Sequence, residues 1–369
     1  MKWTLQGSLS SGQVHTDAII IPVTKKQAAE GGVSEAWDPL LKPLAESRLF
    51  DGTPNRSFVW PESIEGESRL LIWLGRPEGI LTSEQLRLLA AQAGKAAVKS
   101  GVRSAAIQIP NTMVNFTAEQ TPQDAAQALT EGFILGSYRK PHYKRDAAEQ
   151  TNLEEILYYI EEDMDAEFEA GWTKGMSLGA AIGEATCLAR DLTNLPGNML
   201  LPEDLAQKAL QVAKRNGFEA QVLDEEGLVE KGMGGLLAVG KGSIHPPRMI
   251  TLRYQGRETW EDVIGLVGKG VTFDTGGVSL KRASGMEDMI SDMGGAATVL
   301  RNQTGREGGT ITGGLFVGTF ADGLPWVHFD IAGTAYLSKE RGVDPKGATG
   351  VLVRTITDWI LKQVQVVMD

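Results

Sequence analysis

The chain has 369 residues, of which 42% are hydrophobic and 22% charged, as is ordinary for a globular protein of two or three domains. Its formal net charge of −11 argues against nucleic acid or another polyanion as a general partner. The single cysteine, Cys187, excludes an intrachain disulfide and indicates a reducing compartment. We interpret it as a small buried helix residue rather than a nucleophile.

Nothing in the sequence predicts an association with a membrane. The first residues lack a basic region followed by an apolar run, which a signal peptide requires. No uninterrupted apolar run approaches the length of a membrane span. We therefore expect a cytoplasmic protein without a membrane partner.

The first part of the chain alternates between strand and helix patterns. Buried strands are predicted at 17–23, 69–75 and 104–110. An amphipathic helix is predicted at 83–101, where Ser83 can cap its start and Gly101 can end it. Because strand, helix and strand in succession typically form a parallel unit, we predict an α/β domain over residues 1–150.

A polar, basic stretch at 138–155 is typical of a connection between domains with solvated charges. The second domain, predicted over 151–369, begins with a long helix at about 165–192. A loop rich in proline and glycine then leads into another helix within 194–218. Further strands are predicted within 219–228, 234–243, 248–256 and 262–273. This pattern again indicates an α/β fold, with a mixed or parallel sheet.

One glycine-rich stretch, VGKGVTFDTGGVSLKRASGMEDMISDMGGAATVL at 267–300, contains two lysines and three aspartates in apolar surroundings. Lys269 follows a predicted buried strand, at the end where functional groups lie in α/β folds. Asp274 lies on a turn that glycine allows to bend sharply. The apolar residues that follow recur at helical spacing, and Asp292 projects from this predicted helix.

Two carboxylates brought together from a strand end and a helix repel each other unless a cation lies between them, and hard oxygen ligands suit Mn, Mg or Zn. A buried Lys269 beside a metal ion can become a ligand, because burial and an adjacent cation both favour its neutral amine. Lys281 can instead remain charged and stabilise a developing oxyanion. On spacing alone, plain salt bridges are the favoured alternative, and a phosphate loop is disfavoured because the Walker spacing is lacking.

The same stretch resembles the signature of the leucyl aminopeptidase family, the cytosolic two-metal aminopeptidases also called peptidase family M17. Blocks similar to the family's occur in family order at 189–206, 232–256, 304–312, 325–336 and 346–355. The resemblance covers nearly all of the second part, and the first part is similar to the family's more variable N-terminal domain. It implies an N-terminal α/β domain followed by a C-terminal mixed-sheet metallopeptidase domain.

The resemblance implies roles for individual residues. Lys269, Asp274 and Asp292 fall on metal ligands, and Asp274 bridges the two ions of the family. Those ions bind the free α-amino group and the carbonyl oxygen of the peptide, and they activate a bridging water for attack. Lys281 falls on the catalytic lysine that polarises the scissile carbonyl and stabilises the tetrahedral intermediate.

Two further positions and the assembly also follow from the resemblance. Met289 and Ala332 fall on positions that line the apolar pocket for the first side chain of the substrate. The partners implied are peptide substrates and further copies of the same chain, because the family is typically a homohexamer.

One part of the family pattern is missing. In family members, the GGAA helix is followed by a long segment with the motif NTDAEGR, whose Asp and Glu are metal ligands and whose Arg holds a bicarbonate. Here GGAATVL runs through residues 301–302 directly into QTGREGG, and NTDAEGR is absent. The C-terminal domain is therefore expected to lack several elements after about residue 300, and this loss would expose apolar surface and unpaired strand edges.

The missing motif changes the expected metal content. Three of the four protein ligands of the family's tighter site remain, whereas the other site keeps only Asp274. We therefore expect one divalent ion or none, Mn or Zn, in place of the family's two. Asp288, Glu307 and Asp330 are candidates for replacing the lost ligands, although each also has an ordinary structural interpretation.

The sequence thus predicts a metal-dependent aminopeptidase that releases N-terminal, preferably apolar, leucine-like residues from peptides through a metal-activated water. The first alternative is a catalytically inactive family member that acts through assembly or binding. The second alternative, based on the glycine-rich turns alone, is an α/β nucleotide-binding module. Metal content and turnover separate the first two, and nucleotide binding without a divalent metal identifies the third.

Overall fold

In the computed structural model, the chain forms two compact units. The first unit holds Met1–Cys187 together with Glu340–Pro345, and the second holds Leu188–Lys339 together with Lys346–Asp369. The residues described are 1–7, 15–64, 67–114, 116, 120–140, 152–160, 164–256, 258–261, 263–277, 280–294, 296, 317–321 and 323–368.

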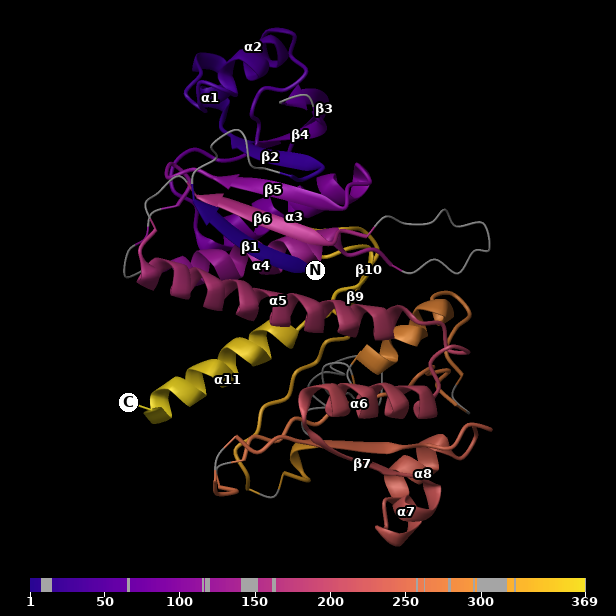
Figure 1. Cartoon of the computed structure of the whole chain (residues 1–369). Helices are drawn as coiled ribbons and strands as arrows, with labels where there is room; N and C mark the ends of the chain where they lie inside the picture. Colours follow the sequence, from indigo (N-terminus) through magenta and orange to yellow (C-terminus); the bar gives the residue numbers. More distant parts are fainter. Residues whose placement is uncertain are drawn as a thin grey trace. The chain divides into compact units, whose positions relative to one another are not determined.

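The first unit is built on a six-stranded mixed sheet (Figure 1). Its strands are β1 (Lys2–Gly7), β2 (Ala18–Val23), β3 (Ser57–Ile64), β4 (Glu67–Gly75), β5 (Ser104–Ile109) and β6 (Glu155–Ile160). In space the order is β1-β6-β5-β2-β4-β3, and all neighbours are parallel except the antiparallel pair β3–β4. The three strands predicted in this part are confirmed as β2, β4 and β5, and the predicted α/β class is confirmed with them.

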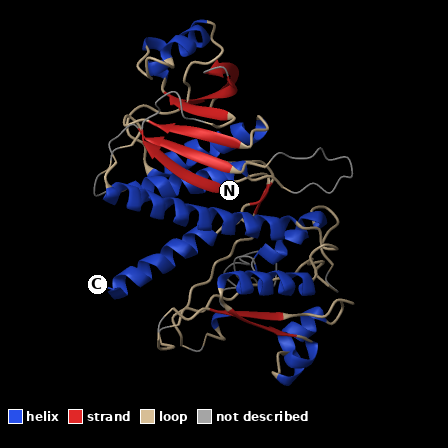
Figure 2. Ribbon diagram, in the orientation of Figure 1, coloured by secondary structure: helices blue, strands red, loops and turns tan. Residues whose placement is uncertain are grey.

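Both faces of this sheet are covered by helices. The helices of the first unit are α1 (Lys25–Glu30), α2 (Asp38–Glu46), α3 (Ser83–Lys99), α4 (Pro122–Ser137) and the first part of α5 (Ala166–Asn194). Ile20 belongs to the core shared with α3, α4 and α5, whereas Ile19 and Ile21 belong to the core shared with α1 and α2. Successive side chains of a strand point to opposite faces of the sheet, which explains this alternation. Because both faces are buried, the strands are continuous apolar runs in the sequence. Figure 2 shows the strands and helices as separate layers.

The predicted helix at 83–101 is confirmed as α3, which begins one residue earlier than the predicted cap implies. Thr82, rather than Ser83, is the cap, because its hydroxyl accepts the backbone N–H of Gln85 while the Gln85 side chain accepts the backbone N–H of Thr82. Gly101 follows the helix with a φ of 70°, a conformation that favours glycine.

The helices α3 and α4 contact each other through their backbones. A Cβ at Gly94 would lie 2.5 Å from the carbonyl oxygen of Phe133, and a Cβ at Gly136 would lie 2.0 Å from that of Ala91. No side chain fits at either position, so glycine is what allows the two axes to come so close. The two helices therefore form one rigid pair.

The second unit contains shorter elements. They are the end of α5, then α6 (Pro202–Asn216), β7 (Glu219–Leu223), α7 (Glu225–Glu230), α8 (Gly234–Gly240), β8 (Met249–Arg253), the 3-10 helix η1 (Met286–Met293), β9 (Tyr336–Leu337), β10 (Gly347–Ala348) and α11 (Val353–Met368). Among its described residues the strands form two antiparallel pairs, β7–β8 and β9–β10. The long predicted helix is confirmed as α5, and the helix after the proline- and glycine-rich loop is confirmed as α6. None of the helices that the structure describes is long and apolar enough to cross a membrane.

Two predicted strands of the second unit are wrong. The apolar run at 234–243 contains helix α8, since a short apolar run without alternation fits a helix as well as a strand. The described residues of 262–273 belong to neither a helix nor a strand, and Val263, Leu266 and Val267 are 53%, 56% and 62% exposed. A strand needs hydrogen-bonded neighbours, and in the described part of the unit β8 pairs with β7 alone.

Cys187 lies on α5 and is half-buried against the apolar cluster of Ala91, Leu135 and Val343. Its place on a helix agrees with the interpretation as a packing residue, although it is less buried than predicted. Its neighbours in this cluster are apolar.

Candidate metal centre

Lys269 and Asp292 come together although 23 residues separate them in the chain. The Lys269 ammonium donates to the carboxylate of Asp292 and, at 3.3 Å, to its backbone carbonyl oxygen. The two side chains are only 16% and 20% exposed. Gly270 makes this approach possible, because a Cβ there would lie 2.6 Å from the Cβ of Ala296, just after η1. The absence of a side chain at position 270 therefore allows the segment of Lys269 to pass close to the segment that carries Asp292.

Asp274 and Lys281 form a second ion pair within one loop. The Lys281 ammonium donates to Asp274 Oδ2 at 2.5 Å, and the backbone N–H of Gly276 donates to Asp274 Oδ1 at 2.8 Å. The backbone N–H of Lys281 donates to the Thr275 carbonyl oxygen at 2.9 Å and closes the loop. Both oxygens of Asp274 are thus satisfied by groups of its own loop.

The two ion pairs form a single electrostatic cluster. Burial raises the pKa of Asp292 and outweighs the opposing charge of Lys269, and the nearby charge of Asp274 raises it further. For Asp274, burial acts to raise the pKa, but hydrogen bonds from Lys281 and Gly276 and the charges of both lysines together hold it below its usual value. Each carboxylate also responds to the charge of the lysine in the other pair, so the two ion pairs are electrostatically coupled.

Among the described residues, this donor set contains too few carboxylates for a pair of divalent ions. Asp274 and Asp292 offer hard oxygen ligands, and Lys269 can add a nitrogen ligand when its amine is neutral. Over the residues that the structure describes, no group of three or more His, Cys, Asp or Glu side chains is arranged to hold a metal ion. The cluster therefore combines two carboxylates and one amine, fewer acidic ligands than a two-metal centre requires.

The candidate replacement ligands do not complete this set in the described contacts. Asp288 is exposed, and its charge acts on Tyr336, whose pKa is raised first by burial and then by Asp288. Asp330 Oδ1 accepts the backbone N–H of Ala332 at 2.9 Å. Glu307 lies outside the described residues.

Of the two predicted pocket residues, Met289 lies at the cluster. Its Sδ atom accepts a hydrogen bond from Lys281 Nζ at 3.2 Å, and the residue is half-buried on η1. Ala332 is exposed in the turn with Asp330, and its place in a substrate pocket stays a prediction.

Two buried polar residues at the end of α5 have a structural role that we did not predict. Arg190 is fully buried and donates through Nε to the Thr349 carbonyl oxygen at 2.9 Å. Asn194 Oδ1 accepts the backbone N–H of Ala348 at 3.2 Å. These bonds hold the block 346–349 to the helix. Because Asp191 and Thr193 beside them are polar as well, no signal in the sequence distinguishes these two residues.

Profiles of two family domains match this chain. The profile described as "Cytosol aminopeptidase family, catalytic domain" matches residues 187–302 and 300–357, and that of the family's N-terminal domain matches residues 20–147. The chain belongs to the cytosol aminopeptidase family. The family consists of metallo-aminopeptidases, as the resemblance of the signature stretch implied.

Similar proteins agree with this family. A probable cytosol aminopeptidase of Bacillus subtilis is 30% identical, in an alignment that covers 93% of this chain and 95% of the relative. A probable cytosol aminopeptidase of Bacillus licheniformis is 29% identical, with 93% and 96% covered. Among solved structures, the bottromycin maturation enzyme BotP in complex with Mn has a TM-score of 0.72 at 23% identity, covering 92% of this chain and 98% of that chain. A tomato leucine aminopeptidase mutant has a TM-score of 0.64 at 23% identity, covering 80% and 57%. At these identities the two structures show the fold.

The alignments with the two Bacillus relatives are longer than the chain itself. They run over 485 and 488 positions, whereas this chain has 369 residues, so each relative contains positions that this chain lacks. The two parts of the catalytic-domain match meet at residues 300–302. This junction is where the sequence passes directly from GGAATVL into QTGREGG.

Proposed function

We propose that this member of the cytosol aminopeptidase family is a metal-dependent aminopeptidase that releases N-terminal, preferably apolar residues from peptides. The observation that carries the proposal is the pair of neighbouring ion pairs, in which Lys269 bonds to Asp292 and Lys281 bonds to Asp274. The names of the Bacillus relatives and the manganese complex of BotP, whose fold is similar, support it.

In this proposal Asp274, Asp292 and the neutral amine of Lys269 hold one divalent ion, Mn or Zn. When bound, such an ion activates a water molecule and polarises the peptide carbonyl. Lys281 donates to the same Asp274 carboxylate that would hold the ion, so its ammonium would be released for the substrate where Asp274 serves as a ligand. The freed Lys281 ammonium donates to the carbonyl oxygen of the scissile bond and stabilises the negative charge that develops there. Met289 lies beside Lys281 and, together with Ala332, lines the apolar pocket for the first side chain.

A second candidate is a catalytically inactive family member that acts through assembly or binding. It is favoured by the two-carboxylate donor set and by the junction at residues 300–302, where we propose that the segment with the other metal ligands and the bicarbonate arginine is absent. The exposed apolar run at 263–267 agrees with the loss of neighbouring strands.

One experiment separates the two candidates. The metal content of the purified chain is measured after equilibration with Mn and then with Zn, and hydrolysis of leucyl-p-nitroanilide is measured on the same samples. The aminopeptidase predicts about one ion per chain and turnover that Lys281→Met lowers roughly 100-fold or more, while the exposed control Lys362→Met keeps full activity. Bound metal without turnover identifies the inactive candidate, and two ions with turnover would contradict the one-ion site.

We further propose that the chain forms a homo-oligomer, a hexamer as the resemblance implies, in the cytoplasm. We also propose a domain boundary at about residue 150, which the end of the N-terminal profile at residue 147 supports. Sedimentation velocity of the full chain tests the oligomer, and a monomer at micromolar concentration would contradict it.

A further inference from the structure

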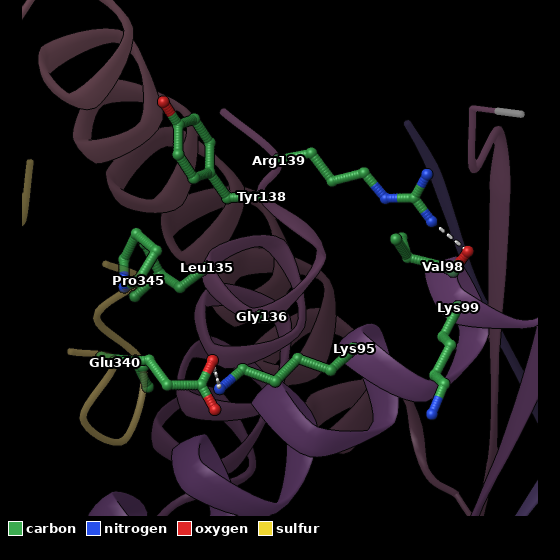
Figure 3. A pocket seen from close by; sticks show the side chains of 10 residues that line it. Lys95, Val98, Lys99, Leu135, Gly136, Tyr138, Arg139, Glu340 and Pro345 are labelled. Carbon is green, nitrogen blue, oxygen red and sulfur yellow. Dashed lines mark hydrogen bonds and ion pairs between the residues drawn. The ribbon is translucent and has the colours of Figure 1, made fainter. Parts of the chain in front are cut away.

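A pocket of about 290 Å³ lies in the first unit, at the C-terminal ends of α3 and α4 (Figure 3). Its third wall is the segment 340–345, which belongs to the same compact unit although it comes from the far end of the sequence. The volume is just below the usual range of about 300–1,000 Å³ for small-molecule sites. None of the residues of the candidate metal centre lines this pocket.

The walls of the pocket are preformed. The two helices are held in backbone contact by Gly94 and Gly136, as described above. The segment 340–345 is closed by two backbone hydrogen bonds of 2.9 Å between Arg341 and Asp344. Gly342, with a φ of 58°, makes the tight turn possible, and its carbonyl oxygen accepts the Lys95 ammonium at 3.2 Å. Little conformational entropy of the protein is therefore lost when a ligand binds here.

The inner surface of the pocket is apolar. Leu135 and Val343 are buried in the same cluster, at 2% and 8% exposure, and both line the pocket. Val98 and Pro345 add further apolar surface. These apolar groups do not stabilise a bound hydrated inorganic ion, whereas a short hydrocarbon chain binds favourably because its apolar surface is buried against them.

The rim of the pocket is basic, in a chain whose net charge is −11. Lys95 lies 3.6 Å from the carboxylate of Glu340, which is 72% exposed, whereas the side chains of Lys99 and Arg139 extend away from it (Figure 3). Arg139 donates to the carbonyl oxygen of Val98, and over the described residues no other group accepts from its guanidinium, which leaves N–H donors for a ligand. Within the residues that the structure describes, Lys99 has neither an ion pair nor a side-chain hydrogen bond to the protein (Figure 3). The charge left over on the rim is positive.

We propose that this pocket binds a small organic carboxylate with a short aliphatic body. The carboxylate is held by Arg139, because a guanidinium donates charge-assisted hydrogen bonds to carboxylates, and the exposed ammonium of Lys99 adds to the positive charge of the rim. The aliphatic part lies against Val98, Leu135 and Val343. Both a free apolar amino acid and its deaminated acid carry this chemistry. The proposal does not depend on the peptidase activity.

The test uses the full chain with labelled Leu and Val methyl groups, observed by NMR. 4-Methylpentanoate is the probe, and a Kd of about 1 mM is expected for a ligand of about eight non-hydrogen atoms. The methyl groups of Val98, Leu135 and Val343 are expected to shift together. The neutral isostere 4-methylpentanamide is expected to bind at least about tenfold more weakly, because it lacks the charge. Leucine is titrated in parallel to distinguish the two sources, and specific binding of either compound supports the proposal.

Variants identify the groups that bind the carboxylate. Lys99→Gln removes an exposed charge without a protein partner, so the variant keeps its fold, and the double variant Lys99→Gln/Arg139→Gln is expected to weaken binding about tenfold or more. The matched control Lys42→Gln removes an exposed lysine on α2 and is expected to leave the Kd unchanged.

Three results would overturn the proposal. The first is an absence of shifts at the pocket methyl groups at about 10 mM probe, well above the expected Kd. The second is equal binding of the carboxylate and its amide, which would make the pocket merely apolar. The third is equal binding of inorganic phosphate and 4-methylpentanoate, which would make the aliphatic part irrelevant.

Discussion

Removal of Asp292 from its ion pair tests how strongly burial couples this carboxylate to Lys269. Asp292→Asn, Lys269→Met and the double variant form a double-mutant cycle, which measures the coupling between the two side chains. The isosteric asparagine keeps the volume of the aspartate, so the change in the free energy of unfolding reports the charge and not a cavity.

The expected coupling follows from burial. Exposed ion pairs contribute about 0.2–1 kcal/mol, whereas removing one partner of a fully buried pair costs about 3–5 kcal/mol. The side chains of Lys269 and Asp292, at 16% and 20% exposure, lie between these limits but nearer the buried one. We therefore expect a coupling free energy of about 1–3 kcal/mol.

The assay is urea unfolding of the full chain at neutral pH with a chelator present, so that no metal contributes. The matched control is the cycle for Lys362 and Asp358, a pair on α11 with side chains 67% and 64% exposed and a separation of 2.8 Å. Its coupling is expected to be about 0.3–0.5 kcal/mol. If the Lys269–Asp292 coupling were no larger than this control, the argument that burial strengthens the pair would be refuted.

Three further predictions concern other features of the second unit. Gly270→Ala is expected to destabilise the chain by about 1–3 kcal/mol, because the new Cβ meets Ala296, and the compensating Ala296→Gly should recover part of this loss in urea unfolding. Val267→Lys is expected to change the free energy of unfolding by less than about 0.5 kcal/mol and to reduce binding of an apolar dye, since Val267 is 62% exposed; a loss of about 2 kcal/mol would show that the residue is buried instead. Hydrogen bonds from Gln207 and from Arg248, together with the charge of Arg248, lower the pKa of Glu203, so its contribution to stability is present above the unfolded-state pKa and is lost as the pH falls through the lower folded-state value. The difference in urea midpoint between the wild type and Glu203→Gln should therefore shrink between about pH 6 and pH 3, and a constant difference would contradict this linkage.

The centre of the first unit could be predicted from local sequence alone, namely the strands β2, β4 and β5 and the helix α3, whereas β1, β3, β6, α1, α2 and α4 were not predicted. The strand β2 and the helix α3 have the apolar periodicity and the terminal residues that their packing requires, and both lie at the predicted positions. The second unit was less predictable for a physical reason. The run at 262–273 has the composition of a buried strand, but a strand forms only beside hydrogen-bonded partner strands. Local sequence does not show whether the rest of the chain supplies such partners.

At the candidate site, too, the sequence predicts which residue types are present but not which of them contact each other. The residue types predicted a shared site for Asp274 and Asp292, and the electrostatic coupling between them agrees with this. The sequence did not specify which lysine pairs with which aspartate, since the partner of Lys269 is 23 residues away. It also did not specify the role of Gly270, because the contact with Ala296 depends on how two distant segments pass each other.

The membership of residues 340–345 in the first unit has a consequence for the order of events during synthesis. The ribosome completes Met1–Cys187 early, but the last wall of that unit emerges only after roughly 150 more residues, a delay of about 8–30 s at about 5–20 residues per second. In this interval the apolar surface of Leu135 and its neighbours lacks Val343. A relative with a longer catalytic part would wait longer still, so a shorter chain between the two pieces reduces the time during which the nascent first unit is incomplete.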